Sequence, residues 1–183
     1  MKKIISVVLT SAAIFACNAQ NIKADFAKKG WGSWKSAATI AKSSHDQTVG
    51  RTAPGALKLT IGPKNPLNKS ICFLHHLPIK PGKSYTASIW YKTKGTASDV
   101  KVSMSFQGLD AKRQFLNNGV RGTSKNAAGE WTRLIYSIKI PEKQFKWDKA
   151  AFLLCTLGAS NSAEGEIWFD DFEFQEDSEE DDE

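Results

Sequence analysis

Apolar and polar residues alternate over much of this chain, which is the pattern of β-strands that bury one face. The alternation is clear from Ser84 to Lys92, from Val100 to Gln107 and from Leu134 to Ile140. Its apolar members are predicted to face a core: Tyr85, Ala87, Ile89, Tyr91, Val100, Val102, Met104, Phe106, Leu134, Tyr136, Ile138 and Ile140. The residues between them are predicted to lie on an outer face.

Strand-like runs recur along the chain and are separated by clusters of Gly, Pro, Asn and Ser. The runs are Thr39 to Ala41, Ala56 to Ile61, Ser70 to Ile79, Ser84 to Thr93, Val100 to Gln107, Thr132 to Ile140, Ala151 to Leu157 and Glu166 to Phe174. About eight strands with such frequent turns predict an all-β protein, a two-sheet antiparallel β-sandwich. The segment Asp110 to Glu130 has few core residues and is predicted as a long loop or a short edge strand.

The last strand, Gly165 to Phe174, contains two adjacent carboxylates, Asp170 and Asp171. Strict alternation would point one of them into the core, where an unpaired carboxylate is costly. The sequence therefore implies a β-bulge, a partner or a cation at this position.

Three short motifs carry a resemblance to a known family: LPIKPGKSYTASIWYKTKG (Leu77 to Gly95), WTRLIYSIKIP (Trp131 to Pro141) and GEIWFDDFEF (Gly165 to Phe174). In this order they resemble the jelly-roll carbohydrate-binding modules of the cellulose- and xylan-binding type, which have a galactose-binding-like fold. The resemblance covers roughly residues 22 to 175, and it implies a jelly roll that binds a polysaccharide or oligosaccharide without catalysing a reaction.

A sugar site needs an aromatic platform surrounded by hydrogen-bonding side chains. The predicted outer faces supply Trp90, Gln107 and Arg133, with His76 from a neighbouring strand, and Trp34 lies in a glycine-bearing loop at the rim. Packing against the protein itself is the alternative for both aromatic residues. The neighbouring Trp31 is expected to pack under the sandwich, as the corresponding Gly-Trp does in the resembling modules.

Those modules often hold one structural calcium ion between the closing strand and the N-terminal segment. The resemblance implies Asp171 and Asp25 as ligands here, together with carbonyl oxygens near Gly55, and oxygen ligands suit calcium. The family's usual Asn-Gly-Asp-Phe-Glu is replaced by Lys23-Ala24-Asp25-Phe26-Ala27, which removes one carboxylate. A hydrogen-bonded Asp171 without metal is the alternative.

The segment Met1 to Cys17 begins with lysines, continues with an apolar stretch and ends in small residues, as an export signal does. Its last four residues resemble a bacterial lipoprotein box with Cys17 as the acylated residue. Cleavage after Ala19 by the ordinary signal peptidase is the alternative. The chain is therefore expected to be exported, as a cell-surface or periplasmic lipoprotein or as a secreted protein, with contact to a membrane only through a lipid at Cys17.

Residues 1–19 are accordingly predicted as the signal, 20–175 as one carbohydrate-binding-like domain and 176–183 as a disordered tail. The tail holds seven acids and no base, and such a segment has too little apolar surface to fold. Without the tail, Lys2 and Lys3, 23 basic residues stand against 12 acidic ones, so the body carries about +11. Cys72 and Cys155 can pair in an oxidising space, or remain two buried thiols.

Catalytic motifs are poorly represented. The sequence has no Gly-x-Ser-x-Gly, no phosphate-binding loop and no Cys-x-x-Cys, and the adjacent His75 and His76 face opposite sides of a strand. We therefore predict a monomeric, non-enzymatic binding module with a carbohydrate partner and no nucleic-acid partner. Three alternatives remain: a structural or protein-interaction sandwich of the cell envelope, a protein that binds anionic polymers through charge alone, and a small glycan-active enzyme.

Overall fold

The computed structural model describes residues 21–24, 26, 30–37, 39–63, 71–159 and 164–178. Their regular structure consists of antiparallel strands and one short 3₁₀ helix, η1 (Trp147–Lys149). Among these residues, no helix is both long and apolar enough to cross a membrane. The predicted signal, with Cys17, and the predicted calcium ligand Asp25 lie outside the described residues.

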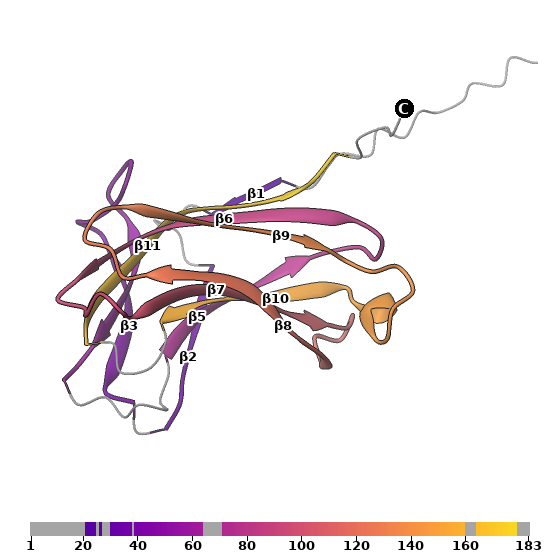
Figure 1. Ribbon diagram of the computed structural model, residues 1–183, viewed down its shortest axis with the longest axis horizontal. Helices are drawn as coiled ribbons and strands as arrows, with labels where there is room; N and C mark the ends of the chain where they lie inside the picture. The colour runs from indigo at the N-terminus through magenta and orange to yellow at the C-terminus, as the bar shows by residue number, and fades with distance from the viewer. Residues whose placement is uncertain are drawn as a thin grey trace, which may run out of the picture.

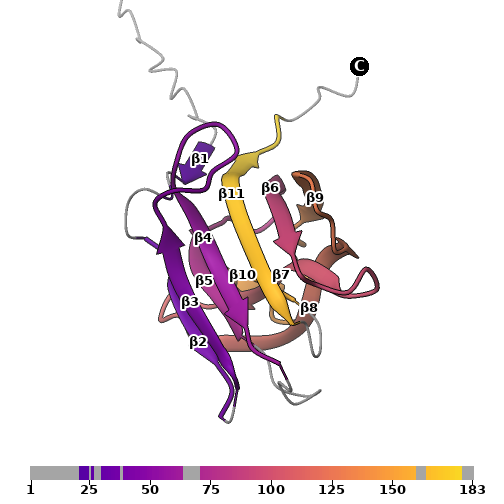
Figure 2. The ribbon, with the colours of Figure 1, turned by 90° about the vertical axis from the view of Figure 1, so that its left-hand side faces the viewer.

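The strands form two sheets that lie one above the other (Figure 1). Sheet A has the order β3-β4-β11-β6-β9, with β1 also paired to β11, as Figure 2 shows. Its strands are β1 (Asn21–Ala24), β3 (Ala41–Asp46), β4 (Ala56–Ile61), β6 (Ser84–Lys94), β9 (Thr132–Lys139) and β11 (Gly165–Glu176). Sheet B has the order β2-β5-β10-β7-β8. Its strands are β2 (Gly32–Lys35), β5 (Ile71–Pro78), β7 (Lys101–Leu109), β8 (Phe115–Asn126) and β10 (Phe152–Ala159).

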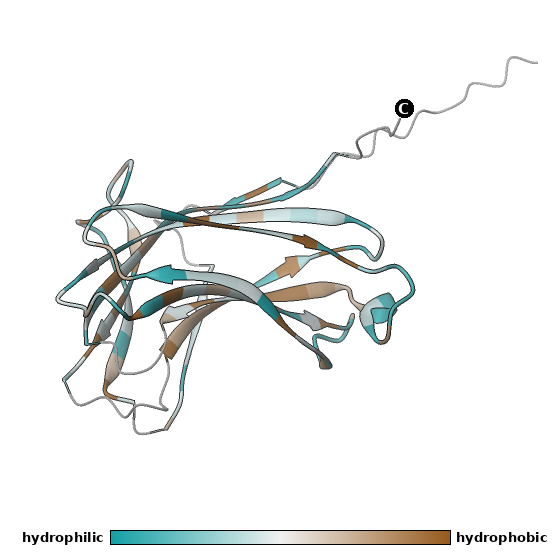
Figure 3. Cartoon of the chain, in the orientation of Figure 1, coloured by the Kyte–Doolittle hydropathy of each residue, from teal (hydrophilic) through white to brown (hydrophobic). Residues whose placement is uncertain are grey.

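The core lies between the two sheets and is built from the alternating apolar residues. Along single strands the alternation is visible as changes between hydrophobic and hydrophilic colours (Figure 3). Phe73 of sheet B meets Phe169 of sheet A edge to face at 6.5 Å between ring centroids, and Phe106 stacks on Tyr136 at 5.8 Å. The predicted core faces of β6, β7 and β9 are confirmed, because their apolar members are buried or pack against the core.

The two-sheet antiparallel sandwich is thus confirmed, but its edges differ from the prediction. The segment predicted as a long loop or short edge strand contains β8, a strand of 12 residues paired with β7. Only Leu116 of this strand is a buried large hydrophobic residue. An edge strand with two largely exposed faces needs no apolar alternation, so the sequence pattern does not indicate its length. Strands β1 and β2, at the start of the domain, were also missed.

The last strand extends slightly further than predicted. Strand β11 continues through Glu176, whose register partner is Tyr85, and the backbone N–H of Asp177 donates to the carbonyl of Ser84 at 2.9 Å. The first residues of the predicted acidic tail therefore belong to the folded domain, because the neighbouring strand offers them backbone partners. Residues 179–183 lie outside the described part of the chain.

Cys72 and Cys155 do not form a disulfide: both are free, buried thiols. Cys155 points into the core from β10, whereas Cys72 lies on the opposite face of sheet B, where its register partners are Trp34 and Gly158. Two thiols on opposite faces of one sheet cannot meet without rebuilding the strand. Burial raises the pKa of Cys72 to about 11 and that of Cys155 well above its ordinary value.

Candidate functional site

The outer face of sheet B is a continuous surface made by residues in register across its strands. One row consists of Trp34, Cys72, Gly158, Ser103 and Ser124, from β2 to β8. The next row is Gly32, Leu74, Thr156, Ser105 and Gly122, and a third is His76, Leu154, Gln107 and Val120. Each row runs across the sheet, so strands far apart in sequence contribute to one surface.

Small residues at the middle of this face leave a groove of about 720 Å³. Its lining includes Gly158, Ser103 and Thr156, with Leu74 and Leu154 as the apolar part of the floor. Sheet B arches in Figure 1, and its hollow side faces away from sheet A. The groove thus results from the curvature of the sheet together with short side chains at its centre.

An exposed aromatic side chain lies on each edge strand beside the groove. Trp34 of β2 is 52% exposed and Phe115 of β8 is 54% exposed, and both line the groove. Single exposed aromatics are ordinary on a protein surface, but two that border one groove form a platform at each side. Strand β8 can lie close to β7 because residue 122 is glycine: a Cβ there would be 2.3 Å from the carbonyl oxygen of Met104.

Polar groups stand between these aromatic residues. Gln107 projects from β7 into the groove, and the exposed His76 is two strands away in the same row. Desolvation, followed by the charges of Arg113 and His75, lowers the pKa of His76. A neutral imidazole can both donate and accept hydrogen bonds, as the Gln107 amide can. Trp34, Gln107 and His76, three of the predicted binding residues, therefore share one surface.

Trp90 and Arg133, the other two predicted binding residues, lie elsewhere, so the predicted five do not form a single site. They are register partners on the outer face of sheet A, on the opposite side of the sandwich. The guanidinium carbon of Arg51 lies 3.9 Å from the centroid of the Trp90 ring and covers it. Arg133 donates to Ser88 Oγ at 2.9 Å and lies 3.5 Å from Glu173. Both side chains are thus occupied by contacts within the protein.

The adjacent carboxylates Asp170 and Asp171 occupy a β-bulge, which is one of the three arrangements that their pattern implied. The register of β11 on β6 shifts between Asp170 and Glu173, and Asp171 has a φ of 48°. Asp170 is 6% exposed and accepts backbone N–H bonds from Arg51 at 2.7 Å and from Asp171 at 2.8 Å. Burial raises the pKa of Asp170, although these bonds oppose the increase.

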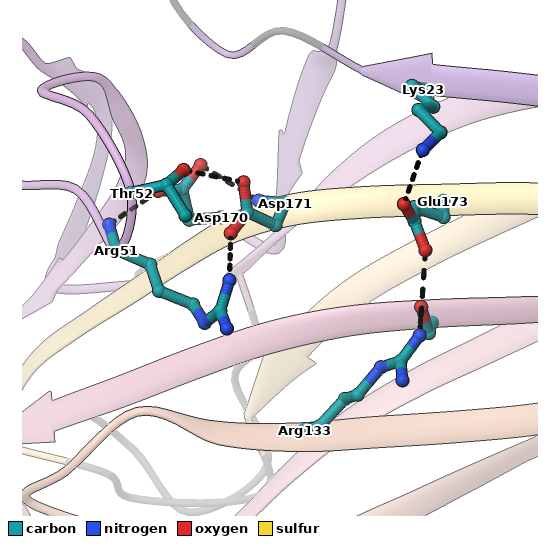
Figure 4. Close-up of polar contacts among 8 residues, drawn as sticks. Lys23, Arg51, Thr52, Arg133, Asp170, Asp171 and Glu173 are labelled. Atoms are coloured by element: carbon teal, nitrogen blue, oxygen red, sulfur yellow. Dashed lines mark hydrogen bonds and ion pairs between the residues drawn. The ribbon is translucent and has the colours of Figure 1, made fainter.

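Asp171, the predicted calcium ligand, forms an ion pair with Arg51 (Figure 4). Arg51 Nη1 lies 2.7 Å from its Oδ2, and Thr52 Oγ1 donates to Oδ1 at 3.1 Å. A cation is therefore already present beside Asp171, an arrangement that does not fit a calcium ligand well. The described residues contain no group of three His, Cys, Asp or Glu able to hold a metal. Calcium at Asp171 and Asp25 stays a prediction, since Asp25 is outside the described residues.

Three other tryptophans pack against the protein. Trp31 stacks on His75 at 4.9 Å and meets Phe172 edge to face at 5.1 Å, as expected for a residue under the sandwich. Trp147 is buried in η1, and Trp168 is buried with its indole N–H donating to Asp46 at 2.9 Å. Phe115, by contrast, is not a predicted site residue, because its segment is predicted as a long loop or a short edge strand. The alternation that identifies outer faces is weak there.

No protein-family model and no curated protein matches the chain. Several solved structures do match it, and carbohydrate-binding modules or domains of similar size are among them. The first family 22 xylan-binding domain of Paenibacillus barcinonensis Xyn10C is 10% identical, with a TM-score of 0.63 over 86% of this chain and 95% of that one. The family 11 module of Clostridium thermocellum Lic26A-Cel5E is 10% identical, with a TM-score of 0.61 over 89% and 97%.

The enzymatically active domain of bacteriophage CBA120 tailspike protein 4 is also similar, at 12% identity and a TM-score of 0.62. This chain covers 19% of that protein, and 81% of this chain is matched. At such identities the likeness concerns the fold. The chain has the jelly-roll β-sandwich fold of carbohydrate-binding modules, as its three motifs predicted.

Proposed function

We propose that the chain is a non-catalytic carbohydrate-binding module and that the groove on sheet B holds a polysaccharide or oligosaccharide. A sugar ring has an apolar C–H face that stacks on an aromatic ring and a rim of hydroxyls that needs hydrogen-bonding partners. Trp34 and Phe115 supply stacking surfaces, while Gln107, His76 and Thr156 supply polar groups between them.

The observation that carries this proposal is the position of two exposed aromatic residues on opposite edge strands of a hollowed sheet face. One of the similar modules is described as a xylan-binding domain. This similarity supports carbohydrate binding by the present chain, but it does not indicate a particular sugar. Export, as a lipoprotein acylated at Cys17 or as a secreted protein, fits a ligand found outside cells and is part of the proposal.

The competing hypothesis is a structural sandwich of the cell envelope with no glycan ligand. A steric block distinguishes the two, because Thr156 is at the centre of the groove on β10. The Thr156→Tyr variant should abolish binding in affinity electrophoresis against a panel of soluble polysaccharides. Ser137→Tyr, on the exposed outer face of sheet A, is the matched control and should bind normally.

Both variants must retain the melting temperature of the parent for the comparison to count. If the parent binds no polysaccharide, or if Thr156→Tyr binds as well as Ser137→Tyr, the groove is not a glycan site.

A further inference from the structure

We infer that the groove takes an anionic polysaccharide, a polymer with carboxylate or sulfate groups, in preference to a neutral one. This inference rests on the proposed function of the groove and adds the class of ligand. It comes from the distribution of charged residues over the two sheets.

Acidic residues are confined to one of the two sheets. The five strands of sheet B contain no Asp or Glu. Of their basic residues, Lys101 has the parity of the outer face, whereas Lys35, Arg121 and Lys125 are register partners of the core residues Ile71, Phe106 and Val102. All acidic residues that lie in strands belong to β3 and β11 of sheet A. A polyanion lying along sheet B therefore meets no carboxylate from the strands beneath it, and this removes the usual repulsive term.

The carboxylates of sheet A, moreover, are matched by cations of the same sheet and its loops. Glu166 pairs with Lys58, and Asp171 pairs with Arg51. Glu173 lies between Lys23, at 3.0 Å, and Arg133, at 3.5 Å, as Figure 4 shows. Much of the positive charge of sheet A is thus compensated by ion pairs within that sheet and its loops.

Arg113 places a cation beside the groove. It follows β7 in the turn to β8, and its guanidinium carbon lies 5.4 Å from the centroid of the Phe152 ring. Phe152 and Phe115 are both register partners of Leu109, so Arg113 stands at the Phe115 end of the face. No ion pair of the described residues involves Arg113, and its positive charge helps to lower the pKa of His76.

The lining itself agrees with an anionic ligand. Its polar groups are the Ser103 and Thr156 hydroxyls, the Gln107 amide, the Cys72 thiol and the Trp34 indole N–H, and it contains no carboxylate. A carboxylate in a sugar cleft accepts hydrogen bonds from neutral hydroxyls but repels a uronate or sulfate group. Stacking on Trp34 and Phe115 would hold the sugar rings, while Arg113 would form a charge-assisted bond to an acidic substituent.

The test uses the full chain and three matched pairs of polymers. Polygalacturonate is compared with its carboxyl-reduced form, a sulfated galactan is compared with its desulfated form, and neutral xylan is compared with glucuronate-substituted xylan. We expect the charged member of at least one pair to bind about tenfold or more tightly than its neutral counterpart. The pair that shows the preference identifies carboxylate or sulfate as the acidic group.

Arg113→Gln should weaken binding of the charged polymer about five- to tenfold and leave the uncharged counterpart unaffected. Arg113→Lys should retain most of the affinity, because it keeps the charge. Lys139→Gln, at an exposed position of sheet A, is the control for an unspecific loss of one positive charge and should have little effect.

Two results would overturn the inference while leaving the groove as a glycan site, provided that Thr156→Tyr abolishes binding. The first is that the neutral polymers bind as tightly as the charged ones or more tightly. The second is that Arg113→Gln keeps the full preference for the charged polymer. If charged polymers bind but Thr156→Tyr and Arg113→Gln behave like Lys139→Gln, binding is by diffuse charge, and both the inference and the proposed groove are wrong. If no polymer binds, the proposed function fails and the inference fails with it.

Discussion

Replacing Trp34 and Trp90 separately by alanine tests the assignment of the groove, because the two indoles have opposite environments. Trp34 is 52% exposed beside the groove, whereas Trp90 is partly buried under the Arg51 guanidinium on the other sheet. A large aromatic side chain has roughly 200 Å² of surface, so about 100 Å² of Trp34 is available to a sugar. At about 25 cal/mol per Å², covering it is worth at most about 2.5 kcal/mol.

Ordering the sugar and its neighbouring side chains reduces this gain, and we expect about 1.4 kcal/mol to remain, which is a tenfold change in affinity. Trp34→Ala should therefore weaken glycan binding about tenfold and cost about 1 kcal/mol or less of stability, as an edge-strand side chain. Trp90→Ala should cost about 1 to 3 kcal/mol, through lost packing and the lost contact with Arg51, and leave affinity unchanged.

Isothermal titration and thermal unfolding of the same two preparations give the required numbers. The reasoning is wrong if Trp34→Ala binds like the parent. It is equally wrong if Trp90→Ala remains folded but loses affinity tenfold, because the glycan would then lie on sheet A.

Two further predictions concern the polar clusters of sheet A. A chelator should leave the melting curve unchanged, because Arg51 already supplies the positive charge at Asp171; a fall of several degrees would instead support calcium at Asp171 and Asp25. Hydrogen bonds from Trp168 and Thr48 lower the pKa of Asp46, so its stabilising contribution is present above the unfolded-state pKa near 4 and is lost as pH falls below it. Between pH 7 and pH 3 the parent should therefore lose roughly 1 kcal/mol more stability than Asp46→Asn, and parallel losses would refute this.

The sequence was sufficient for the sandwich because most strands bury one face, and a buried face imposes alternation on the residues. It also identified Asp170 and Asp171 as an irregular position, to be resolved by a bulge, a partner or a cation, and the register of β11 does shift there. It was insufficient for β8, which lies at an edge and is largely exposed. Two exposed faces impose no pattern, so Phe115 was not recognised.

The site was predicted in part for a related reason. Alternation shows that Trp90, Arg133 and Gln107 point outward from their strands, and this is correct. It does not show which sheet each strand joins, and the outer faces of two packed sheets are on opposite sides of the molecule. Strands β6 and β9 joined sheet A, whereas β5, β7 and β10 joined sheet B. Trp90 and Arg133 were thus assigned to the same surface as Gln107 although the core separates them.

The two outer faces also differ in how much of their binding capacity the fold itself uses. On sheet A, Glu173 of β11 forms ion pairs with Lys23 of β1 and Arg133 of β9. Arg51 forms an ion pair with Asp171 in the bulge and lies over the Trp90 ring. A ligand on that face would have to replace these contacts and would gain little, because each new bond would cost an existing one. On sheet B, short side chains leave a groove and the rings of Trp34 and Phe115 remain half exposed to water. Covering those rings releases that water without breaking an internal ion pair, so binding energy for a polymer is available on sheet B.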